Sequence, residues 1–206
     1  MACRVISISR SMGAGGEEIG RLVARELGFR YADEEIIVKA AERAGVSAET
    51  VAKVEQAPSM IERILESIGR TPPDPEGWSG AALAASTDRS VYEGLIERVI
   101  RQTAGEGDAV IVAHGASVPL AGTEGVLRLL VTASPEVRAK RVAERTSLGE
   151  AAAKKAVAAS DRERKEYLRR FYGVGREQPT HYDLVVNTDA LSPALAAQLV
   201  VAAARA

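Results

Sequence analysis

The sequence predicts a three-layer α/β fold, in which a five-stranded parallel sheet carries helices on both faces. Five short apolar segments alternate with stretches whose apolar residues recur at helical spacing, and such alternation is typical of parallel sheets. A glycine-rich turn joins the first predicted strand to the first predicted helix. The length of 206 residues suits one domain with a sizeable core, so a single domain over 1–206 is expected.

The composition limits which binding partners and which cellular compartment are expected. The formal net charge of −1 provides no overall field that would attract nucleic acid or an anionic membrane surface. Cys3 is the only cysteine, so no internal disulfide can form, which favours a cytoplasmic location. Neither a signal peptide nor an apolar span long enough for a membrane helix is recognised. Small-molecule ligands are therefore expected. The protein is expected to be a monomer or a homodimer.

The first segment predicts an anion-binding turn. Residues 4–9 alternate as a strand does, and three glycines follow before a helix that ends at Gly28, a typical C-cap. A glycine turn exposes backbone N–H groups, and the helix start adds unpaired donors and a positive dipole end. The phosphate-binding candidates are Ser11, Met12, Gly13, Ala14, Gly15 and Gly16. Alternatively, the glycines serve only the tight geometry of the turn.

The second strand, residues 29–32, delivers Asp33 to its carboxyl end, where parallel sheets bind ligands. An N-cap role for Asp33 is an equal alternative, because a helical pattern follows and continues to about residue 67. Residues 70–80 form a loop rich in proline and glycine. Its Trp78 either stacks on a base or, as we expect, pins the loop to the body.

The second half of the chain repeats the strand and helix pattern. A helix over 87–103 precedes a strand over 108–113 that ends at His114, and a further strand covers 126–133. Ser134 and Pro135 predict a helix start. Residues 147–150 have capping-box spacing before a helix that reaches about residue 171. A strand over 183–188 precedes the closing helix, which begins at Ser192.

Basic side chains concentrate between residues 136 and 176, where twelve lysines and arginines face six acids. Arg138, Arg141 and Arg145 follow one another at spacings of three and four, which places them on one helix face. Such a stretch is either a solvated surface or an anion-binding lid.

Several short motifs occur in a common order: the glycine turn, Tyr31 to Ile36, the turn at His114 to Ala116, the triplet Asp161/Arg164/Tyr167, and Tyr182 to Asn187. In this order and spacing the chain resembles the cytidylate kinase-like family. The resemblance implies a P-loop nucleoside monophosphate kinase fold, with a monophosphate-binding helical insert over about 34–104 and an arginine-bearing lid over about 138–176.

The resemblance also implies roles for individual residues. The turn from Ser11 to Gly16 would cradle the phosphates of ATP, and Arg164 would neutralise charge in the transition state. Asp161 would orient Arg164 or contact the acceptor. The remaining implied contacts are donor contacts from the lid by Arg138, Arg141 and Arg145, and acceptor contacts by Asp33 and His114.

The glycine turn departs from the loop that the resemblance implies. Gly16 stands at the position of the phosphate-binding lysine and Glu18 at that of the hydroxyl that binds Mg²⁺. Arg10 is a candidate for the missing positive charge. Glu17 and Glu18 favour the helix start through its dipole, and could hold Mg²⁺ through water.

The leading hypothesis is a phosphotransferase that moves the γ-phosphoryl group of ATP, with Mg²⁺, to a nucleoside monophosphate, CMP by resemblance. A non-catalytic module that binds nucleotides or anions is the alternative that the degenerate loop favours. A kinase for another small acceptor is the third hypothesis.

Overall fold

The computed structural model describes residues 3–33, 36, 38–39, 42–43, 89–112 and 115–206. Within them, five strands form one parallel sheet in the order β2-β3-β1-β4-β5. The strands are β1 (Val5–Arg10), β2 (Arg30–Ala32), β3 (Ala109–Val112), β4 (Val126–Thr132) and β5 (Leu184–Asn187). The five-stranded parallel sheet is confirmed, and each strand begins and ends within one residue of its predicted range.

The central strand of the sheet is β1, which pairs with β3 on one side and β4 on the other. Its residues 5–9 are buried, including Ser7 and Ser9, which are 0% and 2% exposed. Both neighbours run parallel to it, so the turn that follows β1 opens at the carboxyl edge of the sheet. Open parallel sheets bind their ligands at this edge.

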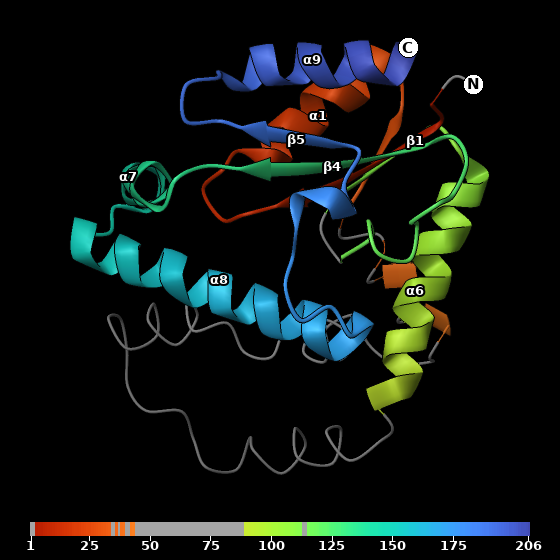
Figure 1. The fold of residues 1–206 in the computed structure, drawn as a ribbon, viewed down its shortest axis with the longest axis horizontal. Coiled ribbons are helices and arrows are strands. Elements are labelled where there is room, and N and C mark those ends of the chain that lie inside the picture. Colours follow the sequence, from red (N-terminus) through yellow and green to blue (C-terminus); the bar gives the residue numbers. More distant parts are fainter. Residues whose placement is uncertain (1–2, 34–35, 37, 40–41, 44–88, 113–114) are drawn as a thin grey trace.

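Helices cover both faces of the sheet (Figure 1). On one face, α1 (Gly16–Leu27) packs beside α9 (Pro193–Arg205), and their apolar side chains meet Ile6 and Ile8 of β1. On the other face, α6 (Arg89–Glu106) packs against Val5 and Ile111. Successive residues of a strand point to opposite faces, so the two cores share β1 and β3. The predicted helical layers are thereby confirmed.

Two further helices follow β4 and bring the basic stretch to the carboxyl edge. Helix α7 (Pro135–Thr146) begins after Ser134, as predicted, and α8 (Glu150–Tyr172) packs against it. The expected capping box is wrong: α8 has Gly149 as its N-cap, and Ser147 ends α7 with a φ of 57°. In Figure 1, α8 lies on the side of the sheet opposite α9. A short 3₁₀ turn, η2 (Pro179–His181), leads into β5.

Several predictions lie outside the described residues. They are most of the helical insert over 34–104, the loop over 70–80 with Trp78, and His114. Among the helices of the described residues, none is long and apolar enough to cross a membrane.

Candidate functional site

The glycine turn between β1 and α1 has the backbone of an anion cradle. Gly13 and Gly15 have φ angles of 77° and 83°, a left-handed conformation that glycine adopts without steric strain. The Ala14 N–H donates to the Ser11 carbonyl at 3.0 Å, which closes the turn. Gly15 is the N-cap of α1, and no side chain caps the helix there. The first-turn N–H groups therefore remain available to an anion, with the positive end of the helix dipole behind them.

Helix α7 rests directly on this turn. A Cβ atom added to Gly13 would lie 2.7 Å from the Arg138 carbonyl oxygen, so only glycine allows the approach. The Arg138 guanidinium donates to the Met12 carbonyl at 3.5 Å, and Arg141 donates to the Gly13 carbonyl at the same distance. Two of the three predicted lid arginines thus contact the backbone of the turn.

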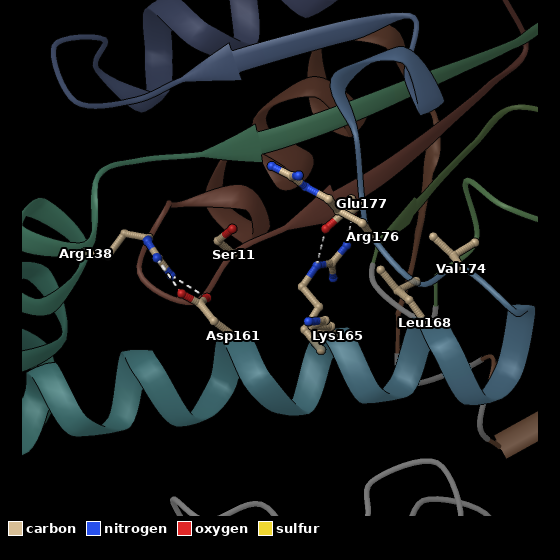
Figure 2. Close-up of a pocket in the computed structure, with 9 residues that line it drawn as sticks. Ser11, Arg138, Asp161, Lys165, Leu168, Val174, Arg176 and Glu177 are labelled. Carbon is tan, nitrogen blue, oxygen red and sulfur yellow. Dashed lines mark hydrogen bonds and ion pairs between the residues drawn. The ribbon is translucent and has the colours of Figure 1, made fainter.

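A cavity of ≈ 530 Å³ opens beside the turn (Figure 2). It lies between the turn, α7, α8 and the segment after α8, and it holds four of the predicted site residues: Ser11, Arg138, Asp161 and Arg164. The other lining residues are Lys165, Leu168, Val174, Arg176 and Glu177. The polar lining is mostly cationic, which suits phosphate groups.

Arg138 and Asp161 join α7 to α8 across one end of the cavity (Figure 2). Both guanidinium Nη atoms donate to the carboxylate oxygens at 2.8 Å, and Nε donates to the Ala133 carbonyl at 3.0 Å. The Arg138 side chain is 5% exposed and that of Asp161 is 43% exposed. Asp161 therefore orients Arg138, whereas its sequence spacing suggested Arg164.

The partner of Arg164 is Glu177, from the segment that returns toward β5. Nε donates to Oε2 at 2.9 Å and Nη2 to Oε1 at 2.6 Å, and Nη2 also donates to the Ser9 hydroxyl at 3.1 Å. The Tyr182 hydroxyl donates to the same carboxylate. The Arg164 guanidinium thus connects α8 to the segment after it and to the end of β1.

These contacts set the charge states of the cluster. Burial acts to raise the pKa of Glu177, but the hydrogen bonds and the charge of Arg164, with the Tyr182 hydrogen bond, hold it below its usual range. Burial also raises the pKa of Tyr182 to about 12, with the Glu177 charge acting in the same direction. Burial alone would lower the pKa of Arg164, yet Glu177 raises it. The pair is therefore fully ionised at neutral pH.

Four further predicted residues, Arg10, Asp33, Arg141 and Arg145, do not line the cavity. Arg141 donates to the Thr188 hydroxyl and carbonyl at 2.9 and 2.6 Å, whereas Arg145 is exposed at the end of α7. Asp33 follows β2 and accepts from the Tyr31 hydroxyl at 3.4 Å. Arg10 forms an ion pair with Glu17.

Sequence patterns did not single out Glu177, Lys165 or Arg176. Lys165 and Arg176 are among the twelve basic residues of 136–176, but the sequence does not distinguish them from basic residues that face only solvent. Glu177 lies in a segment without periodicity, and only its tertiary contact with Arg164 shows its importance.

Comparison with known proteins gives one consistent result. The model of the cytidylate kinase-like family matches residues 5–190. A solved structure of an uncharacterized protein from Eubacterium ventriosum is similar over 98% of both chains, with 16% identity and a TM-score of 0.68. Shikimate kinase from Bacteroides thetaiotaomicron is similar over 96% of both chains, with 14% identity and a TM-score of 0.51. Shikimate kinase from Acinetobacter baumannii, in complex with shikimate, is 12% identical with a TM-score of 0.50, over 97% of this chain and 91% of that one. At these identities the structures share the fold.

Proposed function

The chain belongs to the cytidylate kinase-like family, whose members are kinase-type nucleotide-binding proteins, and on this premise we propose that it phosphorylates a nucleoside monophosphate with ATP. CMP is the first candidate acceptor. The observation that carries the proposal is the cavity that joins Ser11 of the glycine turn to cationic side chains of α7, α8 and the following segment. Phosphoryl transfer depends mainly on positioning and charge stabilisation, and this arrangement offers both.

The glycine turn fits the phosphates of the donor. ATP supplies the transferable phosphoryl group, and Mg²⁺ lowers the repulsion among its phosphates. Residues 11–16 would hold the phosphates through backbone N–H groups, because Gly13 and Gly15 have left-handed backbones and no side chain caps α1. Glu18, in the first turn of α1, would hold Mg²⁺ through water. Among the described residues no group of three or more acids, histidines or cysteines could hold a metal ion, so most of its ligands would be phosphate oxygens and water.

Arg164 is the proposed group that neutralises charge during transfer. Its guanidinium lines the cavity and hydrogen-bonds Ser9, at the end of the strand that precedes the turn. Glu177 holds it by two contacts, which fixes the plane of its donors. Arg138, Arg141 and Arg145 would approach the donor from α7, at the root of the proposed lid over 138–176, and Arg145 is exposed at the end of that helix.

The acceptor is proposed to lie beyond the ends of β2 and β3. Asp33 follows β2, and His114 follows β3 in the sequence. The insert over about 34–104 would bind the monophosphate, by resemblance. Since two shikimate kinases share the fold, a different small acceptor is the second candidate within the same reaction class. The single free cysteine, Cys3, agrees with the reducing cytoplasm, where ATP is available.

A non-catalytic binding module is the competing function. The observations that favour it are the glycine at the lysine position and the engagement of Arg164 and Arg138 by carboxylates. Both functions predict nucleotide binding, but only the kinase predicts a phosphorylated product.

The test is phosphoryl transfer from ATP with Mg²⁺ to CMP, dCMP, UMP, AMP, GMP and shikimate, followed by product separation, with calorimetric binding of each compound. A diphosphate product from one monophosphate supports the proposal. A phosphorylated product from shikimate alone changes the acceptor class. Binding of ATP without any product assigns the binding module instead.

A further inference from the structure

Arg10 and Gly16 face one another across the glycine turn, although five residues separate them in the sequence. A Cβ atom added to Gly16 would lie 2.6 Å from Cβ and 3.0 Å from Cδ of Arg10. Real Cβ atoms essentially never approach another atom so closely. Gly16 is not among the glycines with positive φ, so its backbone would accept a side chain. The aliphatic part of the Arg10 side chain therefore leaves no room for a side chain at position 16.

The charged end of Arg10 stays at the start of α1. Its Nη2 atom lies 2.7 Å from Oε1 of Glu17, in the first turn of the helix, and the two side chains are 27% and 32% exposed. The Nε atom of Arg10 is buried and has no hydrogen-bond partner among the described residues. The guanidinium thus retains a buried, unused donor beside the helix N-terminus.

The Arg10–Glu17 pair has β2, on the proposed acceptor side, as a neighbour of its helix. Burial raises the pKa of the Tyr31 hydroxyl to about 12, and the charges that act on it are, in decreasing order, those of Asp33, Arg21, Glu17 and Arg10. Helix α1, which carries Glu17, packs beside β2: a Cβ atom added to Gly20 would lie 3.1 Å from the Tyr31 ring, and the Arg21 guanidinium lies 5.0 Å from the centroid of that ring. A cation between the glycine turn and the acceptor side is well placed for the outer phosphates of a donor.

In a standard phosphate-binding loop, the residue at the Gly16 position is a lysine that reaches the β- and γ-phosphates. We propose that Arg10 supplies this cation from the opposite side of the turn: its stem fills the space of the absent lysine, and Glu17 holds its guanidinium for a nucleoside triphosphate or diphosphate. The inference rests on the proposed function and adds a donor-binding residue to it. The inference accounts for three features of the turn at once: the glycine at position 16, the arginine at position 10 and the glutamate at position 17.

A purely structural role is the competing explanation, in which the Arg10–Glu17 pair only stabilises the start of α1. The two explanations differ in their dependence on phosphate number. If Arg10 contacts the outer phosphates, its removal weakens binding of ATP and ADP but not of AMP. If Arg10 serves only the fold, its removal lowers the melting temperature and affects the three nucleotides alike.

The experiment measures ATP, ADP and AMP binding by calorimetry on wild type, Arg10→Ala, Arg10→Gln and the double variant Arg10→Ala/Gly16→Lys. Arg10→Gln keeps the stem over Gly16 and removes only the charge, so it still tests the inference if Arg10→Ala does not fold. Both single variants are expected to weaken ATP and ADP binding about tenfold to a hundredfold, which is the usual effect of losing a charged hydrogen bond. The double variant is expected to recover at least half of this loss on a logarithmic scale.

Arg128→Ala is the matched control, because Arg128 pairs with Asp183 between β4 and the start of β5, outside the cavity, the proposed insert and the proposed lid. Gly16→Lys alone is expected to lower the melting temperature, since Arg10 occupies the required space. Unchanged ATP binding in Arg10→Gln overturns the inference and leaves the kinase proposal intact if the variant still forms product. A folded double variant that binds ATP no better than Arg10→Ala also overturns the inference. Wild type that does not bind ATP overturns both proposals.

Discussion

Arg164 and Glu177 form a two-contact ion pair that ties the middle of α8 to the segment leading into β5. The guanidinium also reaches Ser9 at the end of the central strand. Under the proposed function, the arginine would meet a phosphoryl group without a change of side-chain rotamer. The same pair contributes to stability, so its variants must separate the two effects.

Arg164→Ala is expected to reduce kcat for phosphoryl transfer by about 100-fold or more, because a charge-stabilising donor of the transition state is lost. Arg164→Lys keeps the charge but not the two-point geometry, so it should recover only part of the rate. Steady-state kinetics with ATP and the best acceptor measure both. An unchanged kcat in Arg164→Ala contradicts the proposed role.

Arg128→Ala is the matched control for this prediction. Arg128 binds Asp183 by the same two-contact geometry, at 3.1 and 2.7 Å, and is 18% exposed where Arg164 is 20% exposed. Its pair joins β4 to the start of β5 and does not line the cavity. Both alanine variants should lose about 1–2 kcal/mol of unfolding free energy, but only Arg164→Ala should lose activity.

The Glu177 carboxylate predicts a pH dependence of stability. Its folded pKa lies below 4.5, the usual value, so the ionised form stabilises the fold at all pH values above about 4.5. This contribution is lost as the pH falls from 4.5 through the lower folded pKa. Urea unfolding at a series of pH values should show wild type more stable than Glu177→Gln at pH 7, with the difference shrinking below pH 4.5. A difference that is constant down to pH 3 argues against the depressed pKa.

Alanine substitutions at Gly13 and Gly122 separate two contributions to the loss of stability: the strain of a left-handed backbone and the steric clash of the added Cβ atom. Both are left-handed, with φ angles of 77° and 71°, but a Cβ atom would meet the Arg138 backbone at Gly13 and nothing within 4 Å at Gly122. Gly122→Ala should therefore lower the unfolding free energy by about 1 kcal/mol. Gly13→Ala should lower it by roughly a further 1–3 kcal/mol, because α7 must shift, and should also weaken ATP binding. Equal losses in the two variants would mean that α7 moves freely away from the turn.

Lys165 and Arg176 line the cavity and are exposed, and neither takes part in an ion pair within the described part of the chain. Lys165→Met and Arg176→Gln should each weaken nucleotide binding up to about tenfold, since an exposed charge contact is partly screened. Melting temperatures should hardly change. The control is Lys154→Met, which removes an exposed lysine of the same helix that pairs with Glu150 outside the cavity. Unaltered nucleotide affinity in the double variant Lys165→Met/Arg176→Gln would show that the ligand lies elsewhere.

The sequence predicted the fold well because its signals are local. The strands β3, β4 and β5 are mainly apolar runs and β1 alternates apolar with polar residues. Ser134, Pro135 and Gly28 mark helix ends through chemistry that acts within one turn. The capping box at Ser147 failed because a competing C-terminal role of the same residue ended α7 there.

The site was predicted less completely, since its contacts join distant segments. Asp161 and Arg164, which were predicted as site residues from the sequence, both line the cavity. Their partners, however, come from α7 and from the segment after α8, and no periodicity reports such pairings. The position of Arg10 over Gly16 likewise depends on how tightly the turn closes, which composition does not reveal.

The contact between Gly13 and the Arg138 backbone has a consequence for the thermodynamics of binding. The backbone donors of the turn and the first arginine of α7 already lie in fixed positions relative to each other. Under the proposed function, a phosphate that binds in the turn would order neither element further, so little conformational entropy would be lost on association. Anion binding at this end of the site should therefore have a small entropic penalty and a heat signature dominated by direct contacts.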